Sequence, residues 1–186
     1  LDATTRYILF GTKKKIYLYN AGAHTLGALN SSDFGTSEGF RWQVDALNNK
    51  WYLTNCADAL QVFDGSTLAA LSGDGQLPTR AKFLITFLNR IVVAHTYENA
   101  TWYRTRFRSC EVNNPAVWVP NSGVNEAFWT DIDEGYGDIR GLARLGPQRF
   151  VLYYQKAIYV VTYVGGSIIY NIQRVVSDEG LEYPYS

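Results

Sequence analysis

The feature that most constrains the fold is a hairpin pattern that returns four times along the chain. Each unit is an apolar run rich in β-branched and aromatic residues, then a short polar turn, then a second such run, which is typical of two antiparallel strands. Gly, Asn and Pro interrupt the runs, and the apolar residues lack the 3.6-residue period of a helix. The sequence therefore predicts an all-β fold with little helix. The paired runs are Tyr7–Phe10 with Lys15–Tyr19, Trp51–Thr54 with Ala59–Phe63, Arg90–His95 with Thr101–Phe107, and Arg149–Tyr154 with Ala157–Tyr163.

Further apolar runs flank these hairpins. Lead-in strands are expected at Phe40–Leu47, Lys82–Leu88 and Ile139–Leu145, and fourth strands at Thr67–Leu71 and Ile168–Val175. The central runs start about 44, 40 and 59 residues apart, counted from Ile8, Tyr52, Val92 and Val151. Four-stranded propeller blades repeat every roughly 40–50 residues. We therefore predict a β-propeller, or a partial propeller, of about four antiparallel blades.

The long third interval contains residues 111–135, which we expect to be an insertion loop between blades. Loops of this length often carry function or make contacts. We treat residues 1–186 as one propeller-like domain. Since the chain opens at Leu1 and contains no Met, we expect it to be a fragment of a longer chain. Four blades that do not close would leave open strand edges, so more chain or neighbouring subunits are expected to cover them.

Charge and cysteine content exclude several classes of protein. The 17 basic and 17 acidic residues balance to a net charge of +0, which does not favour generic nucleic-acid binding. The one basic run, Lys13–Lys15, is expected in a solvated hairpin turn. No apolar stretch approaches the roughly 20 residues of a membrane-spanning helix. Cys56 and Cys110 lack metal-site spacing, and we expect two buried or half-buried thiols, with a disulfide as the alternative.

The densest acidic segment lies between residues 131 and 138. Clustered carboxylates beside glycines can hold calcium, so Asp131, Asp133 and Asp138 are calcium candidates. The spacing does not match an EF-hand loop. An acidic turn before a strand is the favoured interpretation, and no cofactor is expected.

An arginine series, Arg104, Arg106 and Arg108, has the period of two that places side chains on one face of a strand. We expect this face to be solvated or to form an interface. With Tyr103 and Glu111 nearby, the series also suggests a sialidase-like glycosidase, which would need an arginine cluster and a tyrosine nucleophile. His24 and His95 have no partner motif, and known nucleophile and phosphate-binding motifs are missing from the sequence. We therefore do not expect an enzyme.

The tryptophans are candidates for either core or interface. Buried packing between blades is expected for Trp42, Trp51 and Trp102. Trp118 and Trp129 lie in the expected insertion loop, and we predict that these two lie at an interface.

An ordered series of segments resembles the propeller-like tail proteins of bacteriophages, including the nozzle and hub proteins of short-tailed phages. The segments are Leu60–Gly65, Pro78–Leu88 followed by Asn89–Ala94, a loop around Trp118, Ile139–Leu142 and Lys156–Val161. The resemblance implies a structural virion protein located in the phage tail. Copies would assemble in a ring below the portal, around the DNA exit conduit. The implied partners are other copies of the chain, other tail or portal-adjacent proteins, and exiting DNA through passive contact.

The residues themselves also suggest two alternatives to a structural virion protein. A receptor-binding or glycan-binding propeller module would use aromatic loops for contact. A glycoside-processing propeller enzyme would use the arginine series with Tyr103 and Glu111.

Overall fold

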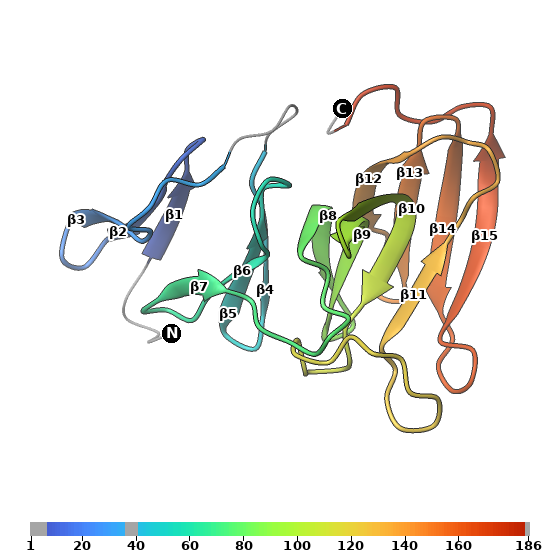
Figure 1. The fold of residues 1–186 in the computed structure, drawn as a ribbon, viewed down its shortest axis with the longest axis horizontal. Helices are drawn as coiled ribbons and strands as arrows, with labels where there is room; N and C mark the ends of the chain where they lie inside the picture. The colour runs from blue at the N-terminus through green and yellow to red at the C-terminus, as the bar shows by residue number, and fades with distance from the viewer. Residues whose placement is uncertain (1–6, 36–40, 185–186) are drawn as a thin grey trace.

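A computed structural model describes residues 7–35 and 41–184 of the chain. These residues form fifteen strands in four antiparallel sheets, and none of them is helical. No helix that could span a membrane therefore occurs in this part of the chain. The sheets follow one another across the molecule in chain order (Figure 1). The all-β prediction is confirmed.

Each sheet is an antiparallel meander, in which every strand pairs with the next along the chain. The first sheet contains β1 (Tyr7–Gly11), β2 (Ile16–Asn20) and β3 (Thr25–Ala28). The second contains β4 (Gln43–Leu47), β5 (Lys50–Thr54), β6 (Gln61–Phe63) and β7 (Leu68–Ala70). The third contains β8 (Arg80–Phe87), β9 (Arg90–Glu98), β10 (Thr101–Ser109) and β11 (Phe128–Asp131). The fourth contains β12 (Ile139–Arg144), β13 (Arg149–Tyr154), β14 (Ala157–Tyr163) and β15 (Tyr170–Ser177).

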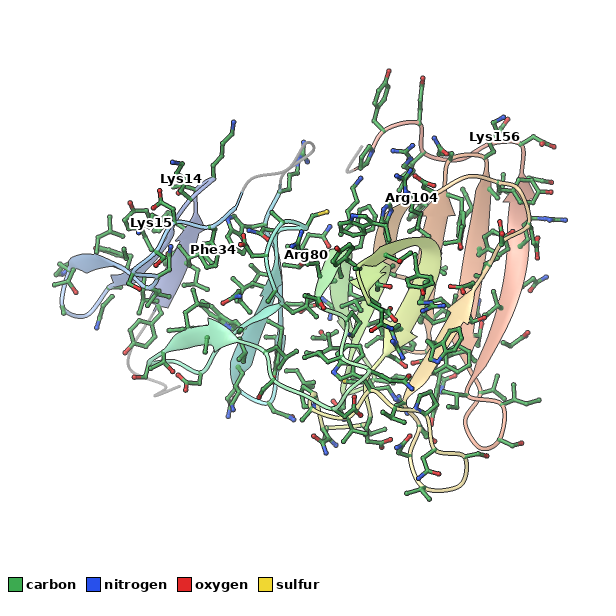
Figure 2. All side chains as sticks on the ribbon, in the orientation of Figure 1. Lys14, Lys15, Phe34, Arg80, Arg104 and Lys156 are labelled. Carbon is green, nitrogen blue, oxygen red and sulfur yellow. The ribbon has the colours of Figure 1, made fainter. Side chains whose placement is uncertain are left out.

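The four predicted hairpins and the lead-in strands are present, apart from Phe40, which lies outside the described residues. Two strands were not predicted. Strand β3 is short, contains Gly27 and is exposed at every residue, so it lacks the alternation that marks a half-buried strand. The Lys13–Lys15 turn links β1 to β2, where Lys14 and Lys15 each lie 3.3 Å from a carboxylate oxygen of Asp33 (Figure 2).

The second unpredicted strand corrects the expected loop at residues 111–135. Residues Phe128–Asp131 form β11, in which Phe128 pairs with Ser109 and Asp131 with Arg106. Strand β11 is therefore the fourth strand of the third sheet. The long spacing between the third and fourth hairpins comes from the loop that joins β10 to β11. A four-residue strand produces too few alternations to stand out from the acidic turn that follows it.

The hydrophobic core is divided into three clusters, each lying between successive sheets. Ile16 of the first sheet packs with Leu53 and Phe63 of the second, and Phe34 lies between these sheets (Figure 2). Side chains of the second and third sheets, such as Tyr52 and Val93, form the next cluster. The largest cluster joins the third and fourth sheets. Each sheet therefore buries alternate residues against its neighbour, as stacked sheets do.

The first strands of the last three sheets lie next to one another, because β8 contacts both β4 and β12. Side chains of β4 cover the open edge of β8. The Gln43 Oε1 and Asp45 Oδ2 atoms accept hydrogen bonds from the backbone N–H groups of Leu84 and Thr86, both at 2.7 Å. Arg144 of β12 lies 3.3 Å from Asp45. Covering the edge in this way prevents pairing with a foreign strand.

The structure contradicts the prediction that Trp118 lies at an interface. Its side chain is 0% exposed and packs in the cluster between the second and third sheets. The Asp74 carboxylate accepts hydrogen bonds from the backbone N–H groups of Trp118 and Val119, at 2.7 and 2.8 Å. The Trp118 indole N–H donates to the Pro115 carbonyl at 2.8 Å. These bonds fold the loop back over the core.

Replacing Trp118 with Ala should lower the free energy of unfolding by about 3–5 kcal/mol, because it removes a fully buried aromatic side chain and leaves a cavity. Urea denaturation measures this change. Val119→Ala, at the next and partly exposed position, is the matched control and should change stability by less than about 1 kcal/mol. Equal effects for both variants would contradict this account of the loop.

Candidate functional site

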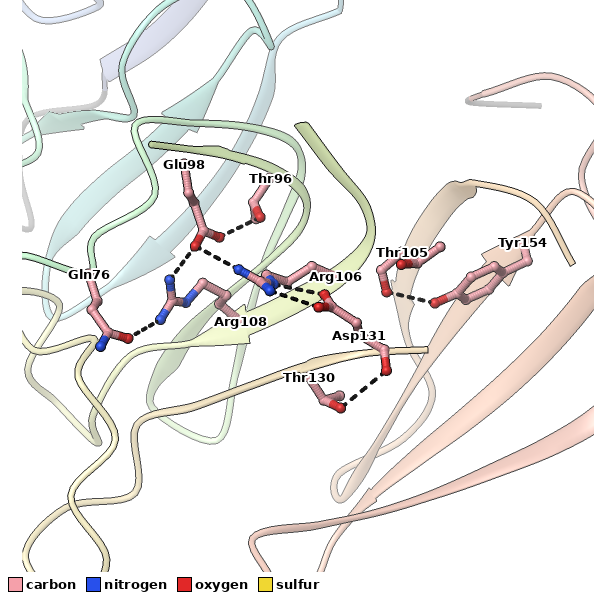
Figure 3. A network of polar contacts seen from close by, with 9 residues as sticks. All are labelled: Gln76, Thr96, Glu98, Thr105, Arg106, Arg108, Thr130, Asp131 and Tyr154. Atoms are coloured by element: carbon pink, nitrogen blue, oxygen red, sulfur yellow. Dashed lines mark hydrogen bonds and ion pairs between the residues drawn. The ribbon is translucent and has the colours of Figure 1, made fainter. Parts of the chain in front are cut away.

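The most concentrated group of buried charges lies on one side of the third sheet. Glu98 of β9 accepts hydrogen bonds from Arg108 at 2.6 Å and from Arg106 at 3.0 Å, both through Oε2. Its other oxygen accepts the Thr96 hydroxyl at 2.6 Å. Arg106 also forms a bidentate pair with Asp131 of β11, at 2.8 and 2.7 Å (Figure 3). Such planar pairs are among the strongest charge-assisted hydrogen bonds.

Gln76 connects this network to the linker between the second and third sheets. Its side-chain oxygen accepts a hydrogen bond from Arg108 at 2.6 Å (Figure 3). The side chains of Arg108 and Glu98 are only 3% and 9% exposed. Buried charges of this kind are tolerated because each has an opposite charge and further hydrogen bonds.

A break in strand pairing brings these groups together. His95 of β9 has a positive φ of 56°, and the pairing of β9 with β10 shifts between Tyr103 and Phe107. Such bulges change the direction of the side chains that follow them. As a result, Glu98 lies on the same side of the sheet as Arg106 and Arg108.

Two aromatic rings enclose the Arg106 guanidinium. Its central carbon lies 3.7 Å from the ring centre of Tyr103 and 4.2 Å from that of Trp129. Trp129 is directly opposite Arg108 in the β10–β11 register and is 41% exposed. Its exposure agrees with the interface prediction, while contact with another molecule stays a prediction.

A cavity of about 420 Å³ opens beside this network. Its walls come from β9, β10 and β11 and from the linker before β8. The lining residues are Gly75, Gln76, Leu77, Thr79, Glu98, Asn99, Tyr103, Arg106, Arg108 and Trp129. This volume lies in the range of small-molecule sites.

Burial and pairing act in opposite directions on the two guanidinium groups. Burial lowers the pKa of Arg106, but its hydrogen bond to Asp131 and the charge of Glu98 outweigh that effect and raise its pKa above the ordinary value. Arg108 is more deeply buried, and burial lowers its pKa despite the nearby Glu98. Both remain charged, since arginine does not lose its proton in proteins.

The structure separates the residues of the sialidase-like hypothesis. Arg104 does not share the buried face. Its side chain is mostly exposed and lies 3.4 Å from Asp138, near the end of the sheet (Figure 2). Glu111 lines a different cavity, of about 650 Å³, beside the loop at residues 122–126. Only Tyr103, Arg106 and Arg108 come together. The last two are buried, so the prediction of a solvated arginine face is wrong for them, whereas an interface at this face stays a prediction.

The candidate calcium ligands do not converge. Both carboxylate oxygens of Asp131 bind Arg106, whereas Asp138 lies beside Arg104. No group of three or more potential metal-ligating side chains occurs among residues 7–35 and 41–184. Asp133 is exposed in the turn that follows β11.

The two cysteines are free thiols, as predicted. Cys110 is buried and Cys56 is half-buried. Burial raises the pKa of the Cys110 thiol to about 12, so this thiol is unreactive at neutral pH.

Sequence reasoning missed Glu98, Gln76 and Asn99. Glu98 and Asn99 were placed in a polar turn, because β9 was expected to end at His95. Gln76 is far from the arginines in sequence, and no local pattern indicates its contact. The period of two in the arginine series was the one sequence pattern that pointed to this site.

Replacing Glu98 with Gln should lower the free energy of unfolding by about 3 kcal/mol, because two buried guanidinium groups lose the carboxylate between them. Chemical denaturation provides the measurement. Glu134→Gln is the matched control, because Glu134 pairs with Arg174 at 2.7 Å on the surface. Its expected cost is below about 1 kcal/mol. A smaller loss for Glu98→Gln than for Glu134→Gln would contradict the assignment.

His95 should make stability depend on pH. Burial lowers its pKa from 6.5 to about 4, even though its Nδ1 lies 3.3 Å from the Ile139 carbonyl oxygen. Between these values the unfolded chain binds a proton that the folded chain does not. The free energy of unfolding should therefore fall by roughly 3 kcal/mol as the pH drops from 6.5 to 4.

Comparing denaturation curves of wild type and His95→Asn at several pH values isolates this effect from that of the carboxylates. Asparagine is a suitable replacement because it tolerates the positive φ of residue 95. The difference between the two proteins should grow on acidification, and a constant difference would refute the buried neutral imidazole.

Comparison with known proteins supports the fold. No protein-family model matches the chain, and no curated protein matches it. Among solved structures, the chain is similar to the crystal structure of the N-terminal domain of Nup159, a β-propeller. The TM-score is 0.56 at 13% sequence identity, and the match covers 91% of this chain and 45% of that chain. Such a likeness concerns the fold alone. The described residues are all-β and form four antiparallel sheets.

Proposed function

We propose that the chain is a structural protein of a phage tail and forms a β-propeller-like ring around the DNA exit conduit by assembling with copies of itself. In this role it acts by assembly and not by catalysis. The observation that carries the proposal is that the two terminal sheets bear apolar outer faces. These faces resemble the ones that the inner sheets bury against each other.

The outer face of the first sheet is apolar and accessible. Ile8, Phe10 and Leu26 are 48%, 49% and 61% exposed. Tyr19 lies directly opposite Ile8, and Tyr17 lies opposite Phe10, so their side chains share this face. Isolated exposed hydrophobic residues are ordinary, but a contiguous group of them usually marks an interaction surface.

The outer face of the fourth sheet has matching chemistry. Tyr153 pairs with Ile158, and Ile158 pairs with Val176, which forms one apolar row. Val151 and Val160 lie in the next row, in which Val151 is buried and Val160 pairs with the exposed Gln173. The opposite side of the same strands carries Phe150, Leu152 and Val161, which belong to the core between the third and fourth sheets.

A second copy of the chain is the occupant that suits both faces. Contact between the outer face of the first sheet in one copy and that of the fourth sheet in another would continue the stacking already present inside the chain. Contacts between unlike faces generate rings where the rotation closes. The chain matches less than half of a longer propeller chain, which supports a partial ring that needs further sheets.

The phage-tail assignment rests on the ordered resemblance of the strand segments and on the neutral charge, which a passive conduit tolerates. A virion protein should remain with tailed particles through density-gradient purification. Mass spectrometry of those particles should then detect the intact chain. Detection only as a soluble monomer in host cytoplasm would contradict this assignment.

Assembly through unlike faces can be tested with two charge substitutions and light scattering. Phe10→Glu disables the face of the first sheet, and Ile158→Glu disables the face of the fourth. Wild type should form oligomers, and each variant alone should be monomeric, because a buried unpaired carboxylate opposes association. An equimolar mixture should form a dimer and nothing larger, since one intact face remains on each partner.

Val124→Glu, in an exposed loop, is the control and should assemble as wild type does. Circular dichroism confirms that each variant is folded. Wild type that stays monomeric at about 100 μM would overturn the proposal. So would oligomers formed by Ile158→Glu alone, because they would show that like faces associate.

A further inference from the structure

We infer that the cavity beside Arg106, Arg108 and Trp129 binds an acidic saccharide, that is, a sugar ring that carries a carboxylate. This inference does not rest on ring assembly. The site lies on the outer strands of the third sheet, away from the apolar faces of the first and fourth sheets.

The hydrogen-bonding groups of the cavity include more donors than acceptors. A guanidinium group has five N–H donors. Arg106 uses three of them on Glu98 and Asp131, and Arg108 uses two on Glu98 and Gln76. Among the described residues, the Nε of Arg108 is a buried donor that has no acceptor. Glu98 already accepts three hydrogen bonds, so a ligand or water is the acceptor that suits this donor.

The charge balance disfavours a phosphate dianion more than a carboxylate. The two guanidinium groups are matched by the Glu98 and Asp131 carboxylates, so the site is close to neutral overall. A phosphate dianion would need an excess of positive charge. A carboxylate carries one charge and matches the planar geometry of guanidinium donors.

The rest of the cavity suits a sugar ring. Trp129 and Tyr103 present aromatic surface, against which the C–H groups of a pyranose can pack. Gln76 and Asn99 bring amide groups, which both donate to and accept from hydroxyl groups. A mostly buried polar wall beside an exposed indole distinguishes this site from a simple anion site.

Isothermal titration with three probes tests each part of the inference. Methyl β-D-glucuronide carries the ring and the carboxylate, methyl β-D-glucoside carries the ring alone, and acetate carries the carboxylate alone. The glucuronide should bind at least ten times more tightly than either of the other two. It should also change the fluorescence of Trp129.

Two variants locate the binding in this cavity. Trp129→Ala removes the ring platform, and Gln76→Ala removes an amide from the linker before β8. Each should weaken binding of the glucuronide at least tenfold. Gln173→Ala, on the exposed side of β15, is the matched control and should leave affinity unchanged.

Three results would overturn the inference. One is the absence of glucuronide binding at 10 mM by folded wild-type protein. Another is equal affinity for the glucuronide and the glucoside, or for the glucuronide and acetate. The third is binding that both cavity variants retain in full.

Discussion

Packing of one apolar sheet face against the next is the interaction on which the rest of this structure depends. The three core clusters all lie between successive sheets. Each cluster combines side chains from two sheets, so the apolar face of one sheet is buried only by its neighbour. Apolar burial of this kind is the main favourable term in folding. Since each sheet needs a neighbour, the two terminal sheets are left with one apolar face each. The proposed self-assembly extends the same interaction beyond one chain.

The polar contacts in turn depend on this stacking. Asp45 reaches from β4 to the backbone of β8 and to Arg144 of β12 only because the inner strands lie side by side. Glu98 can remain buried because two guanidinium groups meet it on the side of the third sheet that the linker covers. In both places a carboxylate satisfies donors from more than one strand. Positions of this kind fix the alignment of elements that apolar packing alone would leave free to slide.

Local patterns made most of the strands predictable, because alternation and turn residues are encoded within a few positions. Trp118 could not be placed in the same way. Its burial depends on Asp74, which is 44 residues away in sequence. The arginine series was recognised, but its environment was not, since strict alternation fails at the positive φ of His95. The sequence therefore did not predict contacts between distant segments or the effect of a break in strand register.

The central claim is that the stack of sheets continues from one copy of the chain to another through unlike faces. Cryo-electron microscopy of the assembled protein tests this claim most directly. The account predicts that the β1–β3 sheet of one copy lies face to face with the β12–β15 sheet of the next, about 10 Å apart as in other stacked sheets. An assembly in which Phe10 and Ile158 both face solvent would contradict it.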